Sequence, residues 1–229
     1  QFSVSGSVKS RMPSANDLYW ATGGNLDLLS ERAEWIQVKW DNEWTLKNNR
    51  SLHFQVNAKT GQVANWIQWL PLPEGIWVAS NFKSVSMNQI EGVFTWKSKL
   101  FQGVLNVTSR TEFTRTTAEN IGMPGVFNMV YTPRVRFSNS LQYMQNGWSV
   151  LLSNSFVSKR FTDEGNLDYY ALPSFNILNA SLNKDWAFNK NKITFQFEIQ
   201  NITNTEYQWI RGYAVPGRVY SIGIKFFIH

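Results

Sequence analysis

The sequence contains no cysteine and only two histidines among its 229 residues. Without cysteine the chain forms no disulfide and offers no thiolate to a metal ion. His53 and His229 are far apart in the sequence, so they do not form a metal site by themselves. The longest apolar runs, such as IWVA, fall well short of the ~18 residues that a membrane-spanning helix requires. We therefore expect no disulfide scaffold, no metal or other cofactor, and no helical membrane span.

Negative charge is in the minority, since 16 Asp and Glu stand against 22 Lys and Arg, a formal net charge of +6. The basic residues are scattered rather than gathered in one run, as Arg110, Arg136 and Lys159 illustrate. A dispersed charge of this size is typical of a solvated surface rather than of a nucleic-acid interface. We expect no nucleic-acid partner.

Aromatic residues, by contrast, are abundant: the chain has 11 Trp, 16 Phe and 8 Tyr, an aromatic share of 15%. The mean hydropathy is nevertheless modest, at −0.31. This combination suits a transmembrane β-barrel, whose strands are apolar on one face only.

Apolar side chains recur at every second position in about ten segments, with little sign of a long amphipathic helix. In ITFQFEIQ, the residues Ile193, Phe195, Phe197 and Ile199 alternate with polar ones. The C-terminal stretch RVYSIGIKFFIH shows the same period. Such alternation predicts antiparallel strands with one apolar and one polar face.

The polar faces and the strand ends distinguish a membrane barrel from a soluble sandwich. A sandwich must fit its apolar faces into a closed core about 10 Å thick. Here bulky aromatics lie near strand ends with aliphatics between them, as interfacial girdles require. The opposite faces carry residues suited to a wet lumen, and we expect the charged ones to form a network that holds a plug: Glu91, Arg110, Glu112, Arg134, Arg136 and Glu198.

The connections alternate between short and long, which predicts short periplasmic turns and long extracellular loops. By this count the last strand descends, and the C-terminus lies in the periplasm. Pro71 and Pro73 are expected to stiffen the second long loop. The short connections lie near 41–49, 97–103, 145–147 and 188–192, and the long ones at 12–30, 61–83, 114–125, 161–172 and 203–217.

Three stretches give the chain a resemblance to the TonB-dependent outer-membrane receptors. The first is RMPSANDLYWATGGNLDLLSERAEW, with a P…LY…GN…L…E pattern. The second is LPSFNILNASLNKDWAF, similar to a late barrel strand of the family. The third, IQNITNTEYQWIRGYAVPGRVYSIGIKFFIH, carries N-x-x-(N/D)-x-x-Y and a G-Y-x-x-P-G-R loop before a closing strand. WIQWLPLPEGIWVASNFKSV also resembles the cobalamin-receptor-like branch.

This resemblance implies that residues 1–229 are the C-terminal part of a 22-stranded barrel in the bacterial outer membrane. The family's plug domain is expected to be absent from this chain. An unclosed sheet in lipid would leave unpaired backbone groups, each costing several kcal/mol. We therefore expect the plug and the remaining strands on another polypeptide or a missing segment, with the lipid bilayer, the TonB complex and a surface lipoprotein as further partners.

The long loops supply the candidate ligand contacts, because aromatic side chains with a few polar groups suit an extracellular ligand vestibule. Each cluster has an alternative interpretation as loop packing or interface anchoring. No catalytic or metal-binding residue is expected. The candidates are Tyr19, Trp20, Trp66, Trp69, Trp77, Tyr169, Tyr170, Trp209 and Arg211.

The leading interpretation is a transport receptor that imports cobalamin, a ferric siderophore, haem or a glycan and performs no chemistry on it. A ten-stranded outer-membrane protease is one alternative, but it requires a histidine at the extracellular rim, and His53 is expected within or near the start of a strand. A soluble carbohydrate-binding β-sandwich is the other alternative.

Overall fold

The computed structural model describes residues 1–72, 74–119, 125–189 and 191–228. Pro73, His229 and part of the expected loop 114–125 lie outside these ranges. The elements in chain order are β1 (Phe2–Arg11), α1 (Ala15–Tyr19), β2 (Glu31–Leu46), β3 (Arg50–Pro71), β4 (Trp77–Leu100), β5 (Gly103–Glu119), β6 (Phe127–Asn128), β7 (Val135–Gln145), β8 (Trp148–Val157), the 3-10 helix η1 (Asp168–Tyr170), β9 (Phe175–Phe188), β10 (Asn191–Gln200) and β11 (Val219–Phe227).

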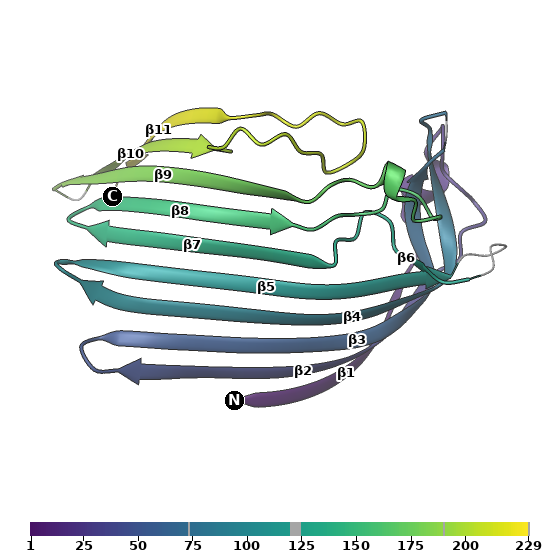
Figure 1. Cartoon of the computed structure of the whole chain (residues 1–229), viewed down its shortest axis with the longest axis horizontal. Coiled ribbons are helices and arrows are strands. Elements are labelled where there is room, and N and C mark those ends of the chain that lie inside the picture. The colour runs from purple at the N-terminus through teal and green to yellow at the C-terminus, as the bar shows by residue number, and fades with distance from the viewer. Residues whose placement is uncertain (73, 120–124, 190, 229) are drawn as a thin grey trace.

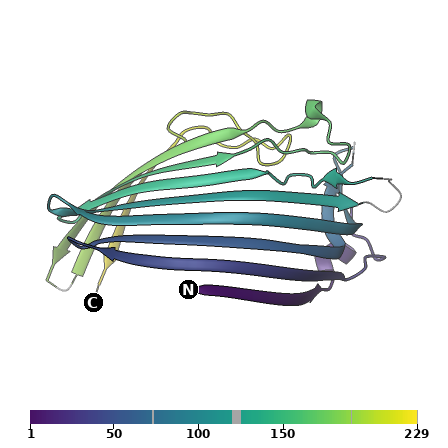
Figure 2. The same cartoon turned by 60° about the horizontal axis from the view of Figure 1, so that its bottom comes forward.

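The strands form one antiparallel meander, as Figure 1 shows. Its order is β1-β2-β3-β4-β5-β7-β8-β9-β10-β11, with the two-residue β6 paired to β5. The expectation of about ten strands is thereby confirmed. The sheet is strongly curved but not closed, and β1 and β11 lie at its two opposite edges (Figure 2).

Short turns lie at one end of the sheet and longer connections at the other (Figure 1). The turn between β7 and β8 consists of Asn146 and Gly147, both with positive φ, of 49° and 76°. This backbone shape matches the twist of a two-residue hairpin and favours an Asn-Gly pair. We call the two ends of the sheet the turn end and the loop end.

The prediction of a long loop over residues 61–83 is wrong. Residues 61–83 do not form a long loop, because β3 and β4 pair from Ala64 and Ser84 up to Pro71 and Trp77. The strands are therefore 22 and 24 residues long, more than the 9–11 residues that cross a bilayer. β5 likewise continues to Glu119, within the expected loop 114–125. The extended β3–β4 hairpin projects beyond the other strands at the loop end.

The register keeps apolar residues aligned across nine strands. Each residue in this row is the direct cross-strand partner of the next, so all of them share one face of the sheet. From β11 to β2 the row reads Tyr220, Ile199, Ala180, Leu152, Leu141, Val107, Trp96, Leu52 and Trp44.

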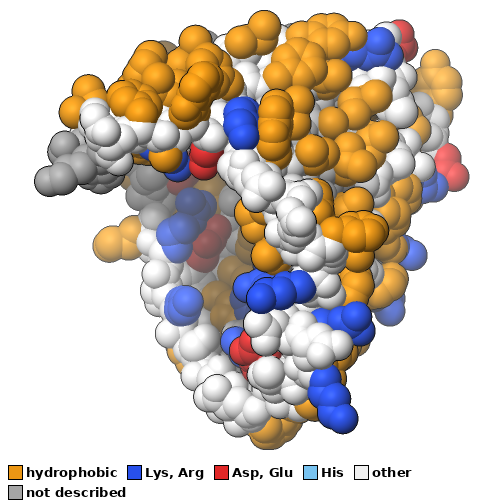
Figure 3. Space-filling model, turned by 90° about the vertical axis from the view of Figure 1, so that its left-hand side faces the viewer, with side chains coloured by type: hydrophobic (Ala, Val, Ile, Leu, Met, Phe, Trp, Pro, Cys, Tyr) orange, Lys and Arg blue, Asp and Glu red, His pale blue; other side chains and the backbone are white. Residues whose placement is uncertain are grey.

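The neighbouring row, one residue along each strand, lies on the opposite face and is polar with one exception, Leu151. Because side chains alternate, these residues line the concave face. The row reads Ser221, Glu198, Ser181, Leu151, Gln142, Asn106, Lys97, Ser51 and Thr45. Figure 3, viewed from the turn end, shows hydrophobic side chains over the outer surface and charged ones within the hollow.

Large apolar side chains on the convex face stay exposed. Phe195 and Phe197 are 43% and 38% exposed, and Ile222 is 83% exposed. The three buried clusters lie instead toward the loop end, around Phe82, Ile67 and Phe175. One curved sheet without a second, facing sheet among the described residues contradicts the soluble-sandwich alternative.

None of the helices in the described part of the chain is sufficiently long and apolar to cross a membrane.

The two faces predict opposite effects for matched substitutions on β10. Phe197→Arg places a cation on the convex face and should cost about 2–4 kcal/mol if that face meets hydrocarbon. Gln196→Arg lies on the concave face and should be tolerated. The yield of heat-modifiable protein in the outer-membrane fraction measures the difference, with Ile222→Arg as a second convex-face variant. Equal yields for both faces would contradict the assignment.

Candidate functional site

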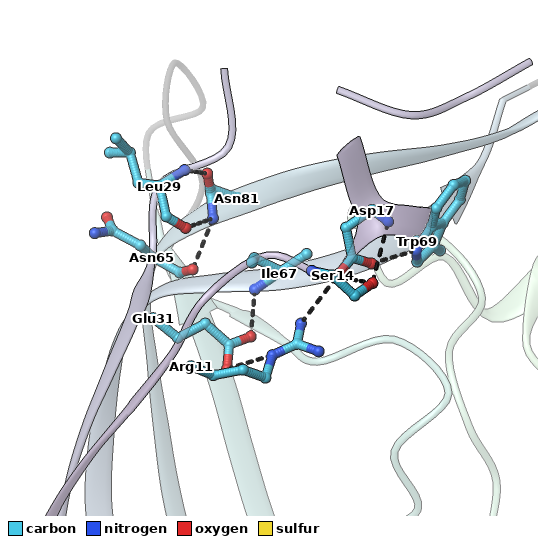
Figure 4. A network of polar contacts seen from close by, with 9 residues as sticks. All are labelled: Arg11, Ser14, Asp17, Leu29, Glu31, Asn65, Ile67, Trp69 and Asn81. Atoms are coloured by element: carbon cyan, nitrogen blue, oxygen red, sulfur yellow. Dashed lines mark hydrogen bonds and ion pairs between the residues drawn. The ribbon is translucent and has the colours of Figure 1, made fainter. Parts of the chain in front are cut away.

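The loop 12–30 is fixed to the β3–β4 hairpin by a polar network (Figure 4). Ser14 caps α1, and its backbone N–H and its hydroxyl each donate to Asp17 Oδ2 over 2.8 Å. The indole N–H of Trp69, on β3, donates to Asp17 Oδ1 over 2.9 Å. The Arg11 guanidinium lies 3.9 Å from the same carboxylate. Asp17 thus joins β1, α1 and the hairpin.

Two further residues, Glu31 and Asn81, fasten the end of this loop. Glu31 accepts a hydrogen bond from the Ile67 backbone N–H over 2.8 Å and pairs with Arg11 at 3.0 Å. Asn81 accepts from the Leu29 N–H over 2.8 Å and donates to the Leu29 carbonyl over 3.2 Å (Figure 4). The long connection is therefore an ordered surface rather than a free loop.

The Asp17 carboxylate is buried, at 5% exposure. Burial alone would raise its pKa, but the hydrogen bonds from Ser14 and Trp69 and the charge of Arg11 lower the pKa below its usual value. The folded loop therefore favours the ionised form.

Three connections at the loop end enclose a cavity of about 630 Å³, which we call the mouth pocket. They are the tip of the β3–β4 hairpin, the β8–β9 loop and the β10–β11 loop, together with Tyr131 from the segment before β7. The lining residues are Pro71, Leu72, Gly75, Trp77, Tyr131, Thr162, Asp163, Tyr170, Arg211 and Tyr213.

Aromatic rings and one cation dominate the chemistry of the mouth pocket. The Arg211 guanidinium lies 4.5 Å from the ring centre of Tyr170, a cation–π contact between two loops. The Trp77 and Tyr131 rings are 6.4 Å apart. Burial raises the pKa of Tyr131, although Arg211 partly opposes this. Tyr131 therefore remains a neutral phenol that can donate a hydrogen bond.

A second cavity, of about 490 Å³, lies on the concave wall. Its sides include Arg110, Arg136, Glu112 and Trp209. Arg110 pairs with Glu91 at 3.5 Å, so part of the expected charged network is present.

Arg160, in the β8–β9 loop next to this cavity, is only 2% exposed. Its guanidinium lies 4.9 Å from the Phe175 ring and 5.8 Å from the Trp209 ring, and Nη2 donates to the Pro173 carbonyl over 3.1 Å. Its Nε and Nη1 have no partner among the described residues. Desolvation lowers the pKa of Arg160, and the neighbouring Arg136 adds to this effect.

The structure brings three of the nine candidate residues together in the mouth pocket: Trp77, Tyr170 and Arg211. The other six lie elsewhere. Trp66 packs against the cluster around Phe82, and Trp69 is bonded to Asp17. Trp209 lines the concave wall. Tyr19, Trp20 and Tyr169 are exposed at 71%, 55% and 86%.

The mouth pocket also contains residues that the sequence did not single out. Tyr213 belongs to the G-Y-x-x-P-G-R stretch, so its position in a long loop was a usable signal. Tyr131 lies between β6 and β7, outside the expected loops, and has a positive φ of 56°. No sequence signal marks its approach to Trp77.

The two histidines do not support the protease alternative. His53 lies on β3 near the turn end, where its Nε2 is 2.9 Å from Asp41 Oδ1. His229 is outside the described residues. Among the described residues no group of three or more His, Asp or Glu could hold a metal ion.

The fold is similar to that of solved iron receptors and transporters. The chain aligns with the ferric-catecholate import receptor Fiu of Escherichia coli K12 at a TM-score of 0.64 and 16% identity, over 99% of this chain and 33% of that one. The alignment with the FrpB iron transporter of Neisseria meningitidis has a TM-score of 0.65 and 15% identity, and it covers 99% of this chain and 37% of that one. The alignment with BauA, the ferric preacinetobactin receptor of Acinetobacter baumannii, has a TM-score of 0.60 and 15% identity, and it covers 98% of this chain and 34% of that one.

The chain has the fold of part of a receptor barrel. It spans about a third of the length of the solved structures that it matches. No family model and no curated protein matches the sequence. The names of the three similar proteins describe receptors or transporters. Their names concern iron ligands and give no support to the cobalamin-receptor-like branch.

The Asp17 network predicts that Asp17→Ala will loosen the loop 12–30. Removing this acceptor leaves the partly buried donors of Ser14 and Trp69 without a partner, which costs about 1 kcal/mol or more. Hydrogen exchange of residues 12–30 should therefore accelerate roughly tenfold or more. The variant Asp27→Ala is the control, because Asp27 is exposed in the same loop.

The lowered pKa fixes the sign of the pH dependence. Asp17 contributes its full stabilisation above about pH 4, the ordinary pKa of an unfolded aspartate, and loses it as the pH falls through the folded-state pKa. Exchange corrected for intrinsic rates should rise below pH 4 in the wild type and not in Asp17→Ala. The same acid response in both proteins would exclude Asp17 as its source.

Proposed function

We propose that this chain forms part of the barrel of a TonB-dependent receptor in the bacterial outer membrane and that the mouth pocket binds the imported ligand. The receptor-barrel fold supports the proposal. So does the register, which places a continuous apolar row on the convex face and a polar row on the concave face. This sidedness suits a sheet between hydrocarbon and an aqueous lumen.

The chemistry of the mouth pocket favours an anionic ligand with aromatic or other flat groups. Arg211 supplies positive charge, while Trp77 and Tyr170 supply ring faces. The phenol of Tyr131 can donate a hydrogen bond to a ligand oxygen. Asp163 also lines the pocket, where its charge opposes that of Arg211, and it accepts hydrogen bonds from the Leu167 N–H. A ferric siderophore with catecholate-like groups fits these features best, with haem and cobalamin as the competing ligands.

Uptake requires partners beyond this chain. Both edge strands have unpaired backbone groups on their outer sides, because β1 pairs only with β2 and β11 only with β10 among the described residues. In a bilayer those groups need hydrogen bonds from further strands. We infer that these strands and a plug complete the receptor, and that the plug couples it to the TonB complex. A surface lipoprotein at the loop end remains part of the proposal.

Neighbouring tyrosines provide a matched test of the ligand site. Tyr170 lines the mouth pocket beneath Arg211, whereas Tyr169 is 86% exposed. Tyr170→Ala and Arg211→Ala should each weaken binding by about 1–2 kcal/mol, roughly five- to thirtyfold. Tyr169→Ala should leave the affinity unchanged. The measurement is quenching of tryptophan fluorescence by a ferric tris-catecholate in the complete receptor.

Cyanocobalamin and haemin serve as competitors in the same titration. If neither competitor displaces the ferric catecholate complex, the siderophore assignment is supported. A tighter affinity for cyanocobalamin that depends on Tyr170 would replace that assignment with cobalamin. Equal loss in Tyr169→Ala and Tyr170→Ala would remove the mouth pocket from the proposal.

The partner proposal predicts that this sequence never occurs alone in the membrane. Intact-mass measurement and peptide mapping of the purified outer-membrane species should show a complex or a polypeptide with enough strands to close the barrel, together with plug peptides. A stable membrane species composed of these 229 residues only would refute it.

A further inference from the structure

A hollow of about 590 Å³ lies at the convex face, between β2 and the start of β7. Its floor follows one cross-strand row in which Ala58 stands between Val38 and Ile90. The methyl group of Ala58 is much shorter than its neighbours, and Phe113 continues the row beside Ile90. The small side chain of Ala58 between larger ones on the neighbouring strands thus creates a depression in the apolar surface.

Two arginines line the hollow, Arg115 and Arg134. Arg115 follows Phe113 on the convex face, two positions farther toward the loop end, and is exposed. Arg134, which was expected to face the lumen, lies directly before β7 and is among the residues that line this hollow. Its Nη2 donates to Asn128 Oδ1 over 2.8 Å. Both cations thus border an apolar depression.

The positive charge at this rim is not neutralised within the described part of the chain. Arg115 has no ion pair or hydrogen bond there, and no acidic residue is among those lining the hollow. Glu34, also on the convex face, pairs with Arg32 at 3.0 Å. Glu119, farther along β5, pairs with Lys83 at 3.4 Å. An external anion would complete the site.

The position of Arg115 along β5 can be compared with the thickness of a membrane when Leu105, near the turn end, is taken as the inner edge of the apolar band. Arg115 lies ten residues beyond Leu105 on β5, which at ~3.3 Å per residue is about 33 Å along the strand. With a strand tilt of about 40°, the height along the membrane normal is about 25 Å, the height of the apolar band of outer-membrane barrels. The hollow then lies within the hydrocarbon and Arg115 at the headgroup level of the outer leaflet.

We propose that this hollow binds an anionic lipid of the outer leaflet, with an acyl chain over Ala58 and a phosphate group on Arg115 and Arg134. Guanidinium groups bind phosphate oxygens through paired, charge-assisted hydrogen bonds. A lipid provides both the apolar tail that the floor requires and the charge that the rim requires. The inference rests on the membrane location in the proposed function but is independent of the ligand in the mouth pocket.

Native mass spectrometry of the complete receptor in mild detergent tests this site. The probes are dioleoylphosphatidylglycerol and dioleoylphosphatidylcholine, which share their acyl chains and differ in headgroup charge. We expect the wild type to retain the anionic lipid preferentially. Arg115→Gln combined with Arg134→Gln should reduce its apparent affinity about tenfold and leave the zwitterionic lipid unchanged. Ala58→Phe, which fills the floor, should reduce the retention of both.

The matched controls are the same kinds of substitution at convex-face positions outside the hollow. Arg32→Gln removes another convex-face cation, and Ala180→Phe enlarges another small convex-face residue, so neither should change lipid retention. The wild type gives an independent measurement, since its preference for the anionic lipid should weaken as salt is raised. Equal retention in all variants, loss in the controls, or a salt-independent preference would overturn the proposal.

Two further outcomes separate the possible failures. Displacement of the anionic lipid by inorganic phosphate at millimolar concentration would overturn the lipid assignment and leave a simple anion site. Failure of the wild type to enter the outer-membrane fraction would refute the proposed function. Normal insertion and ferric tris-catecholate binding without lipid discrimination would refute the lipid site alone.

Discussion

Backbone hydrogen bonding is the constraint on which the structure depends. A strand in hydrocarbon has no water to satisfy its N–H and C=O groups, so each strand must pair along its full length. The register that this pairing imposes carries every second side chain to the same face over nine strands, from Trp44 on β2 to Tyr220 on β11. A slip of one residue in any pair would move an apolar set from the convex face to the concave face.

The same constraint explains what the sequence could predict. Where a strand separates hydrocarbon from water, the two environments impose a period of two, and segments such as ITFQFEIQ were identified correctly. Where both faces of a strand meet protein or water, this contrast ends. Trp66 and Trp69 pack against protein on the extended hairpin, and Pro71 ends β3, so this stretch resembled a loop although it is paired strand. Predictability follows the environment rather than the secondary structure.

The mouth pocket was only partly predictable for a different reason. Of the nine candidates that the sequence offered, Trp77, Tyr170 and Arg211 line this pocket. Which aromatic faces the cavity depends on contacts between segments far apart in sequence. Adjacent tyrosines illustrate this: the Tyr170 ring contacts Arg211, whereas Tyr169 is 86% exposed. Composition identifies the loops, but only the assembled loop end assigns roles to their residues.

Arg160 fixes two of the loops that form this pocket to the end of β9. Arg160 is buried against Phe175, on β9, and Trp209, in the β10–β11 loop. Trp209 is two residues from Arg211, so the cation that reaches Tyr170 extends from a segment already fixed by another cation. A buried arginine with unpaired donors is costly unless its surroundings compensate it. Its contacts with the Phe175 and Trp209 rings and its hydrogen bond to the Pro173 carbonyl offset part of that cost and join the β8–β9 and β10–β11 loops.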